Sequence, residues 1–313
     1  MSRAGDDVTA PARFATIDVG TNTVLLLVAQ RRGDGFVAVR ERAEITRLGR
    51  GVDGSGILQP AAIRDTVAVL ARYAGEARAL GARAIACVAT SAARDARNGG
   101  DFFAAAQREA GLSPEVISGD EEARLVYLTA WREFGAAGAL AVVDVGGGST
   151  EFIVGEGPAL RGRVSLQVGA VRLTERHVRS HPIPPAELET LREAARGALE
   201  PLGALRPARG ARLVGVAGTV TTLAAVARGL PHHDAQRVHG QRLAAGEVEA
   251  LIPAMAALTV PQRAALPGME PARADVIVAG AVVVAEAMRR SGLDPLVVSD
   301  RGVRWGLLHD RFG

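Results

Sequence analysis

The chain of 313 residues contains no lysine, and all 37 of its basic side chains are arginine. This absence excludes P-loop nucleotide chemistry, because a Walker A loop ends in Gly-Lys-Ser/Thr. It also excludes Schiff-base and pyridoxal chemistry, which need a lysine amine. Any anion bound by this protein must therefore be held by arginine, backbone N–H groups and hydroxyls. The charge is too evenly spread to indicate nucleic-acid binding.

Cysteine and long apolar runs are also scarce. Cys87 is the single cysteine, so no intrachain disulfide can form. The longest clean apolar run, residues 276–285, is well short of the roughly 20 residues that cross a bilayer. Residues 1–13 lack the apolar segment of a signal peptide and are expected to form a mobile tail. These features together predict a cytoplasmic protein without a membrane partner.

A sequence repeat indicates how the chain is organised. Residues 16–28 (TIDVGTNTVLLLV) align without a gap with residues 142–154 (VVDVGGGSTEFIV). Each copy predicts a strand, a tight glycine-containing turn and a returning strand, with Asp18 or Asp144 at the end of the first strand. The repeat therefore predicts two similar β-hairpins, one in each half of the chain.

The rest of the sequence alternates between strand and helix patterns. Residues 60–80 carry apolar side chains at helical spacing, whereas residues 84–88 have the pattern of a short buried strand. Residues 37–40 and 44–48 indicate two separate strands, and residues 165–168 indicate another. This alternation predicts a layered α/β architecture. The duplicated hairpin further predicts two similar lobes that face each other across a cleft.

Both hairpin turns have the chemistry of an anion site. Glycine lets the backbone approach an anion closely, and consecutive N–H groups with neighbouring hydroxyls can surround phosphate oxygens. The carboxylates of Asp18 and Asp144 would repel these phosphates unless a cation lies between them, and Mg²⁺ is the expected ion. Glu151 starts the returning strand of the second hairpin and is expected to point toward the same place.

A further acid is expected near the turns. Ser118 and Glu121 form a capping box at the start of a predicted helix, which gives Glu121 a structural role. Glu122 is then free in the first helical turn, where it either complements the helix dipole or acts as a base on water. Arg94 follows a strand and a pair of hydroxyl residues, and it is either a surface arginine or a phosphate ligand.

The second half contains another glycine turn. Residues 215–219 (GVAGT) end a strand and open a helix, which indicates either a simple connection or an anion site at a helix N-terminus. Residues 299–304 repeat this strand–turn–helix pattern. His177 and His181 are spaced i, i+4, and His232 and His233 are adjacent, but no cysteine or acidic partner lies at ligand spacing. These histidines are therefore expected in loops or at the surface rather than in a zinc site.

These motifs together resemble those of the exopolyphosphatase/guanosine pentaphosphate phosphohydrolase (Ppx/GppA) phosphatase family, in a short two-domain form. The most specific segments are residues 118–124 (SGDEEAR) and the glutamate that ends residues 144–151 (DVGGGSTE). The resemblance implies an α/β fold of the actin-like, sugar-kinase and Hsp70-type (ribonuclease H-like) class, with two duplicated domains and an interdomain cleft. The expected lobes are residues 1–130 and residues 131–301, with a closing helix at 302–313 packing on the first lobe.

The resemblance also implies roles for individual residues. Glu122 is expected to be the general base, with Asp144 and Glu151 completing the catalytic set. Asp144, Glu151 and Asp18 are expected to hold Mg²⁺ or Mn²⁺. The expected phosphate ligands are Thr21, Asn22, Thr23, Arg94, Gly146, Gly147, Gly148, Ser149, Gly218 and Thr219.

The function expected from these roles is that of an exopolyphosphatase, which releases terminal orthophosphate from inorganic polyphosphate with the help of a metal. Longer family members carry additional C-terminal helical domains that this chain lacks, so shorter polymers are the expected substrates. The alternatives are hydrolysis of the 5′-terminal phosphate of guanosine pentaphosphate, a kinase or ATPase of the same fold, and a catalytically weak phosphate-ligand sensor. The resemblance also implies a homodimer whose ligands are polyphosphate or a guanosine penta- or tetraphosphate.

Overall fold

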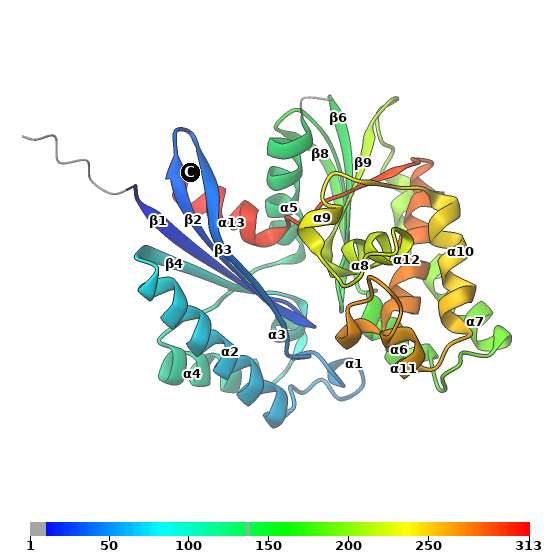
Figure 1. Cartoon of the computed structure of the whole chain (residues 1–313), viewed down its shortest axis with the longest axis horizontal. Coiled ribbons are helices and arrows are strands. Elements are labelled where there is room, and N and C mark those ends of the chain that lie inside the picture. Colours follow the sequence, from blue (N-terminus) through cyan, green and yellow to red (C-terminus); the bar gives the residue numbers. More distant parts are fainter. Residues whose placement is uncertain (1–10, 136–137) are drawn as a thin grey trace, which may run out of the picture.

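The computed structural model describes residues 11–135 and 138–313. The tail expected at residues 1–13 lies mostly outside the described residues. The described chain forms two α/β lobes side by side, each built on its own sheet (Figure 1). The structure therefore confirms the predicted two-lobed α/β fold.

The first lobe is built on a five-stranded sheet with the strand order β3-β2-β1-β4-β5. Its strands are β1 (Arg13–Val19), β2 (Thr23–Arg32), β3 (Gly35–Ile45), β4 (Ala82–Ala89) and β5 (Glu115–Val116). Its helices are α1 (Val52–Ser55), α2 (Pro60–Ala79), α3 (Ser91–Asp95) and α4 (Gly99–Ala110). Ile63, Val67 and Leu70 of α2 are buried against the sheet, which confirms the helical pattern read from the sequence.

The second lobe is built on a six-stranded sheet with the strand order β10-β11-β9-β6-β7-β8. Its strands are β6 (Ala139–Val145), β7 (Thr150–Glu156), β8 (Ala159–Leu166), β9 (Arg212–Val216), β10 (Arg242–Leu243) and β11 (Leu296–Val298). The helices of this lobe are α6 (Ala170–His177), α7 (Pro185–Ala198), α8 (Ala217–Ala227), α9 (Ala235–Val238), α10 (Ala245–Ala256), α11 (Val260–Ala264) and α12 (Ile277–Ser291), with 3₁₀ turns η2 (Glu200–Ala204) and η3 (Pro271–Arg273).

The apolar run at residues 276–285 is a core helix. It forms most of α12, which packs against α6, α7, α8 and α10, and the side chains from Ile277 to Met288 are buried. A helix surrounded by other elements is apolar on all sides because it has no solvent face. Within the described residues, no helix is both long and apolar enough to span a membrane.

Helices α5 (Gly119–Phe134) and α13 (Val303–Phe312) lie between the two sheets and pack against each other (Figure 1). α13 covers β1 and β2, while α5 covers β6, β7 and β8 of the second sheet. The lobe boundary expected at residue 130 falls inside α5. Because α5 packs both on the second sheet and on α13, the exact boundary between the lobes stays a prediction.

The two repeat copies form hairpins with the same register. Val19 pairs with Val24 and Val145 with Thr150 across the respective turns, in both cases between antiparallel strands. The predicted pair of hairpins is therefore confirmed. Each first strand also pairs in parallel with a later strand, β1 with β4 and β6 with β9, which places both turns at the same type of sheet edge.

Two other strand predictions were wrong in extent. Instead of the two short strands expected at residues 37–40 and 44–48, one edge strand, β3, pairs with β2 with a single register shift. It ends at Ile45, so residues 46–48 lie outside it. The strand expected at residues 165–168 is β8, which ends at Leu166. Charged residues on the exposed face of these strands break up the apolar pattern, but the backbone ladder needs only a neighbouring strand.

Candidate active site

The two hairpin turns face each other across a cavity of about 520 Å³ between the lobes. Each turn is closed by the same backbone hydrogen bond, from Gly20 N–H to Thr23 O at 3.0 Å and from Gly146 N–H to Ser149 O at 3.1 Å. The lobes meet closely here, since a Cβ added to Gly148 would lie 2.9 Å from Thr21 Oγ1. Glycine is thus required at this position by the approach of the opposite turn.

Most of the predicted site residues line this cavity. They are Asp18, Thr21, Asn22, Thr23, Glu122, Asp144, Gly146, Gly147, Gly148, Ser149 and Gly218. Glu151, Arg94 and Thr219 are not among the described residues that line it. Glu151 is nevertheless close by, because it pairs with Asp144 across the second hairpin.

Four acidic side chains gather in this region and are almost inaccessible to solvent. Asp18 and Glu122 are 8% exposed, Asp144 is 7% exposed and Glu151 is 1% exposed. Burial, followed by the charge of Asp144, raises the pKa of Asp18 to about 7, and burial raises the pKa of Asp144 to about 7. Burial and the charge of Asp144 raise the pKa of Glu151 to about 8. Like charges buried together destabilise one another, so this cluster favours either protons or a cation.

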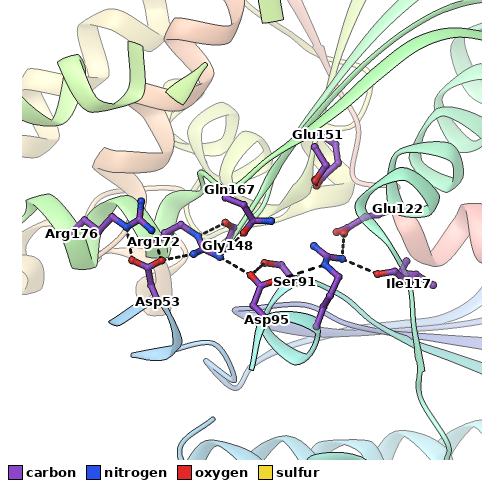
Figure 2. Close-up of polar contacts among 12 residues, drawn as sticks. Asp53, Ser91, Asp95, Ile117, Glu122, Gly148, Glu151, Gln167, Arg172 and Arg176 are labelled. Carbon is purple, nitrogen blue, oxygen red and sulfur yellow. Dashed lines mark hydrogen bonds and ion pairs between the residues drawn. The ribbon is translucent and has the colours of Figure 1, made fainter. Parts of the chain in front are cut away.

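Glu122 has a carboxylate oxygen without a hydrogen-bond partner among the described residues. It lies in the first turn of α5, and burial followed by the charges of Glu151, Asp144 and Asp18 raises its pKa well above the usual range. Its Oε2 has no hydrogen-bond partner among the described residues. Arg94 Nη1 lies 3.7 Å from this oxygen, which is close enough for an ion pair but too long for a hydrogen bond. Figure 2 shows Glu122 beside Glu151.

The neighbour of Glu122 has the structural role expected of it in part. Ser118 Oγ accepts a hydrogen bond from Glu121 N–H at 3.1 Å and so caps α5. The Glu121 carboxylate does not return to the Ser118 backbone as a full capping box requires. It pairs instead with Arg124, at 2.7 and 2.8 Å, because both side chains lie on the same face of α5.

The third glycine turn contributes less than expected. Thr219 Oγ1 donates a hydrogen bond to Val145 O at 3.1 Å and is buried, so its hydroxyl holds α8 to the end of β6 rather than facing the cavity. Gly218 lines the cavity beneath the guanidinium of Arg273, which leaves no room for a Cβ. Ala217 has a positive φ of 73°, an uncommon backbone conformation at the start of α8.

Sequence reasoning missed two residues that contact the predicted ligands. Arg273 reaches from the second lobe to donate a hydrogen bond to Thr23 Oγ1 at 2.9 Å, and burial lowers its pKa to about 10. Ser165 donates a hydrogen bond to Glu151 Oε1 at 2.7 Å. Neither residue belongs to a turn motif, so the sequence carries no signal that distinguishes them. His233 lies in a loop, as expected, but it also lines the cavity.

The donor set fits magnesium better than zinc. The described residues contain no group of three or more His, Cys, Asp or Glu side chains arranged to hold a metal ion. Mg²⁺ needs only one or two protein carboxylates, because substrate phosphates and water complete its octahedral shell. Asp18 Oδ1 is buried and has no hydrogen-bond partner among the described residues, as expected of a group that awaits a cation or a donor.

Comparisons with known proteins identify the family of this chain. The Ppx/GppA phosphatase family model matches residues 27–312. A protein named exopolyphosphatase 2 from Mycobacterium tuberculosis is 41% identical over 95% of this chain and 98% of its own length. The crystal structure of the Aquifex aeolicus member of the Ppx/GppA family is 33% identical, with a TM-score of 0.79 over 96% of this chain and 97% of that chain.

A third relative matches the fold more closely. The crystal structure of an exopolyphosphatase-like protein is 30% identical and has a TM-score of 0.89, over 97% of this chain and 98% of that chain. Both solved structures match nearly the whole described chain, so the likeness covers both lobes and the cavity between them. The expected arrangement of two α/β lobes, each with one copy of the hairpin, is therefore confirmed.

Proposed function

Because this chain belongs to the Ppx/GppA phosphatase family, we propose that it is an exopolyphosphatase, which hydrolyses the terminal phosphoanhydride bond of inorganic polyphosphate. One observation carries the proposal. Glu122, with a carboxylate oxygen free of hydrogen bonds, shares a cavity with two glycine turns and their aspartates. This arrangement combines a base with two cradles for successive phosphates, which is what phosphoryl transfer to water requires.

Each of these residues has a step to perform. The amides of Gly146, Gly147 and Gly148 bind phosphate oxygens, together with the hydroxyls of Thr21 and Ser149. Three further residues of the same cavity also contact the phosphates in this proposal: Asn22, Thr23 and Gly218. Arg94 offsets phosphate charge beside Glu122. Glu122 then accepts a proton from the attacking water, and its raised pKa makes it a stronger base than an ordinary carboxylate.

A divalent cation, Mg²⁺ or Mn²⁺, fits between the acids and the phosphates. Asp144 and Glu151 would hold it, with Asp18 facing them from the first hairpin. When bound, the cation supplies positive charge that offsets the phosphate oxygens and the buried carboxylates. Thr219 acts indirectly in this proposal, by fixing the end of β6 through its bond to Val145.

Phosphate release from polyphosphate, measured with and without Mg²⁺, tests the proposal. Glu122→Gln is expected to lower turnover by about a hundredfold to ten-thousandfold, the usual contribution of a general base. Its affinity for polyphosphate should change little, because the amide keeps the shape of the side chain. Turnover that persists at the wild-type rate in Glu122→Gln would rule out this mechanism.

A preference for short polymers is the finer part of the proposal. The cavity volume of about 520 Å³ is that of a small-molecule site, so it supports enclosure of a chain end rather than of a long polymer. We expect kcat/KM to reach its maximum at short chain lengths and then to stay level. A steady rise of kcat/KM toward long polymers would contradict this preference.

Guanosine pentaphosphate is the competing substrate. Leu25, Ala43 and Ile45 line the cavity beside the first turn and offer an apolar surface of the kind that a nucleoside contacts. Release of phosphate from both compounds, compared side by side at equal concentration, distinguishes the two activities. A protein that binds both but releases phosphate from neither would be a sensor.

Self-association is expected from the family resemblance alone. A homodimer predicts a mass near twice the chain mass of 32.4 kDa by light scattering. A single species at the chain mass, at micromolar concentration, would contradict it.

A further inference from the structure

Arg172 joins the two lobes at the point where the two phosphate cradles meet. It lies on α6, and its Nε donates a hydrogen bond to Gly148 O at 2.8 Å, on the turn of the second lobe. Its Nη2 pairs with Asp95 Oδ2 at 2.8 Å, at the end of α3 in the first lobe. Figure 2 shows Arg172 between these two partners. One side chain thus contacts a phosphate cradle in one lobe and a short helix in the other.

The helix at the far side of this contact carries Arg94. Asp95 Oδ1 lies 3.8 Å from Arg94 Nε, and Asp95 Oδ2 accepts a hydrogen bond from Ser91 Oγ at 3.2 Å. Arg94 in turn donates to Ile117 O at 2.8 Å and lies 3.7 Å from Glu122. A series of polar contacts therefore runs from Gly148 through Arg172 and Asp95 to Arg94.

A second carboxylate of the first lobe fixes the other side of Arg172. Asp53 of α1 pairs with Arg172 Nη1 and also with Arg176 Nε at 2.5 Å. Burial alone would raise the pKa of Asp53, but the hydrogen bonds and charges of Arg176 and Arg172 outweigh it and lower the pKa. The side chains of Arg172 and Asp53 are 12% and 11% exposed. A mostly buried arginine that bonds three separate partners holds them in a defined geometry, unlike a solvated surface pair.

The geometry points to Arg172 as a positioning residue that couples closure of the lobes to the placement of Arg94 beside Glu122. When the lobes are closed, the hydrogen bonds of the Arg172 guanidinium hold the Gly148 turn and α3 at a fixed separation. When they part, Asp95 loses this partner and Arg94 loses its support from the second lobe. This inference rests on the proposed function, in which Arg94 binds phosphate.

Another inter-lobe ion pair provides a matched control. Arg47 Nη1 of the first lobe lies 2.7 Å from Asp275 Oδ2 of the second lobe, with side chains 34% and 29% exposed. Among the described polar contacts, neither side chain touches α3 or the Gly148 turn. Asp275→Asn therefore removes an inter-lobe ion pair without disturbing the contacts that lead to Arg94.

Steady-state kinetics of polyphosphate hydrolysis tests the coupling. Arg172→Gln should lower kcat by about thirtyfold while KM changes by less than about threefold, whereas Asp275→Asn should leave kcat within about twofold of the wild type. Arg172→Lys should keep part of the kcat that Arg172→Gln loses, because an ammonium group keeps the charge but lacks the planar set of guanidinium donors. In an Arg94→Gln background, Arg172→Gln should cost less than about threefold, since the residue through which it acts is already gone.

Hydrogen exchange provides a test that needs no activity. The Arg94 amide is bonded to Thr90 O at 3.1 Å and reports on the integrity of α3. Exchange at residues 91–95 should rise in Arg172→Gln and stay at the wild-type level in Asp275→Asn. If the wild type releases no phosphate, the proposed function fails and this exchange result alone decides the inference. Unchanged exchange in Arg172→Gln, or kinetic losses that multiply with Arg94→Gln, would overturn it.

Discussion

The two hairpins of the repeat share a backbone but differ in their chemistry. Both have an aspartate at the end of the first strand, the same turn hydrogen bond and the same register. The residue opposite the aspartate is Leu25 in the first hairpin and Glu151 in the second. Duplication of the backbone thus supplies two turns of the same geometry, and only the second hairpin pairs two carboxylates across its strands.

The turns differ for a steric reason as well. Asn22 of the first turn occupies the position of Gly148 in the second. A Cβ on Gly148 would come within 2.7 Å of Ser91 Oγ. The second turn therefore requires glycine at this position, whereas the first turn carries a side chain there. We infer that the first hairpin contributes mainly to substrate binding and the second mainly to catalysis.

Substitution of the two matched aspartates, Asp18 and Asp144, is expected to give the largest difference between the hairpins. Asp144→Asn should lower kcat by about a hundredfold or more, because it removes a carboxylate of the proposed metal site next to Glu151. Asp18→Asn should cost about tenfold, since the charge of Asp18 acts on Glu122 less than those of Glu151 and Asp144. Phosphate release at saturating Mg²⁺ measures both, and equal losses would show that the cradles share the chemistry.

Exchange of the matched turn residues should have a smaller effect. Gly148→Ala is expected to destabilise the closed protein by about 2 kcal/mol and to lower kcat/KM by about thirtyfold, because its methyl group meets Ser91 and Thr21. Asn22→Ala should lower kcat/KM by only about threefold, through the loss of one polar contact to phosphate. Thermal unfolding and steady-state kinetics measure these effects. If Gly148→Ala had the stability and kcat/KM of the wild type, the two turns could move apart without loss of free energy.

The two aspartates should be equivalent in stability even though they differ in activity. Each keeps its proton in the folded protein up to about pH 7, whereas the unfolded chain loses it near pH 4. The folded state then binds more protons between about pH 4 and pH 7, so the free energy of unfolding falls as pH rises through this window. Asp18→Asn and Asp144→Asn should each reduce this fall by about 1 kcal/mol or more in urea unfolding without divalent metal.

Equal shifts in both variants would support the comparison. Stability that rises with pH across this window in the metal-free wild type would contradict the raised pKa values. Addition of Mg²⁺ at pH 8 should restore part of the lost stability, because a ligand of the folded state stabilises it.

The smallest expected effect concerns Ser165, which has no counterpart role in the first hairpin. Ser165→Ala removes the hydrogen bond to Glu151 Oε1 and should lower kcat by about threefold to tenfold by leaving the carboxylate less well oriented. Steady-state kinetics at saturating Mg²⁺ measures this loss. An unchanged kcat would mean that the Glu151 carboxylate is oriented without Ser165.

Local patterns were sufficient for the elements that are regular and buried. The apolar face of α2 and the two hairpin turns follow directly from spacing and glycine, and they were predicted correctly. The edge strand β3 was divided in two, because the charged residues at 40–42 interrupt its apolar pattern, whereas its pairing with β2 does not depend on that pattern. Helix α5 was split by the expected lobe boundary, because sequence neighbours do not reveal which sheet covers a helix.

The sequence alone determined the chemistry on offer: two aspartate–glycine turns, a free glutamate after a cap, and arginine as the only strong cation. Only the tertiary structure decided which of these groups meet. It turned Thr219 away from the cavity, placed Arg273 on Thr23, and set Arg172 between Gly148 and Asp95. The physical reason is that motifs depend on local backbone geometry, whereas contacts between lobes depend on how two separate cores pack against each other.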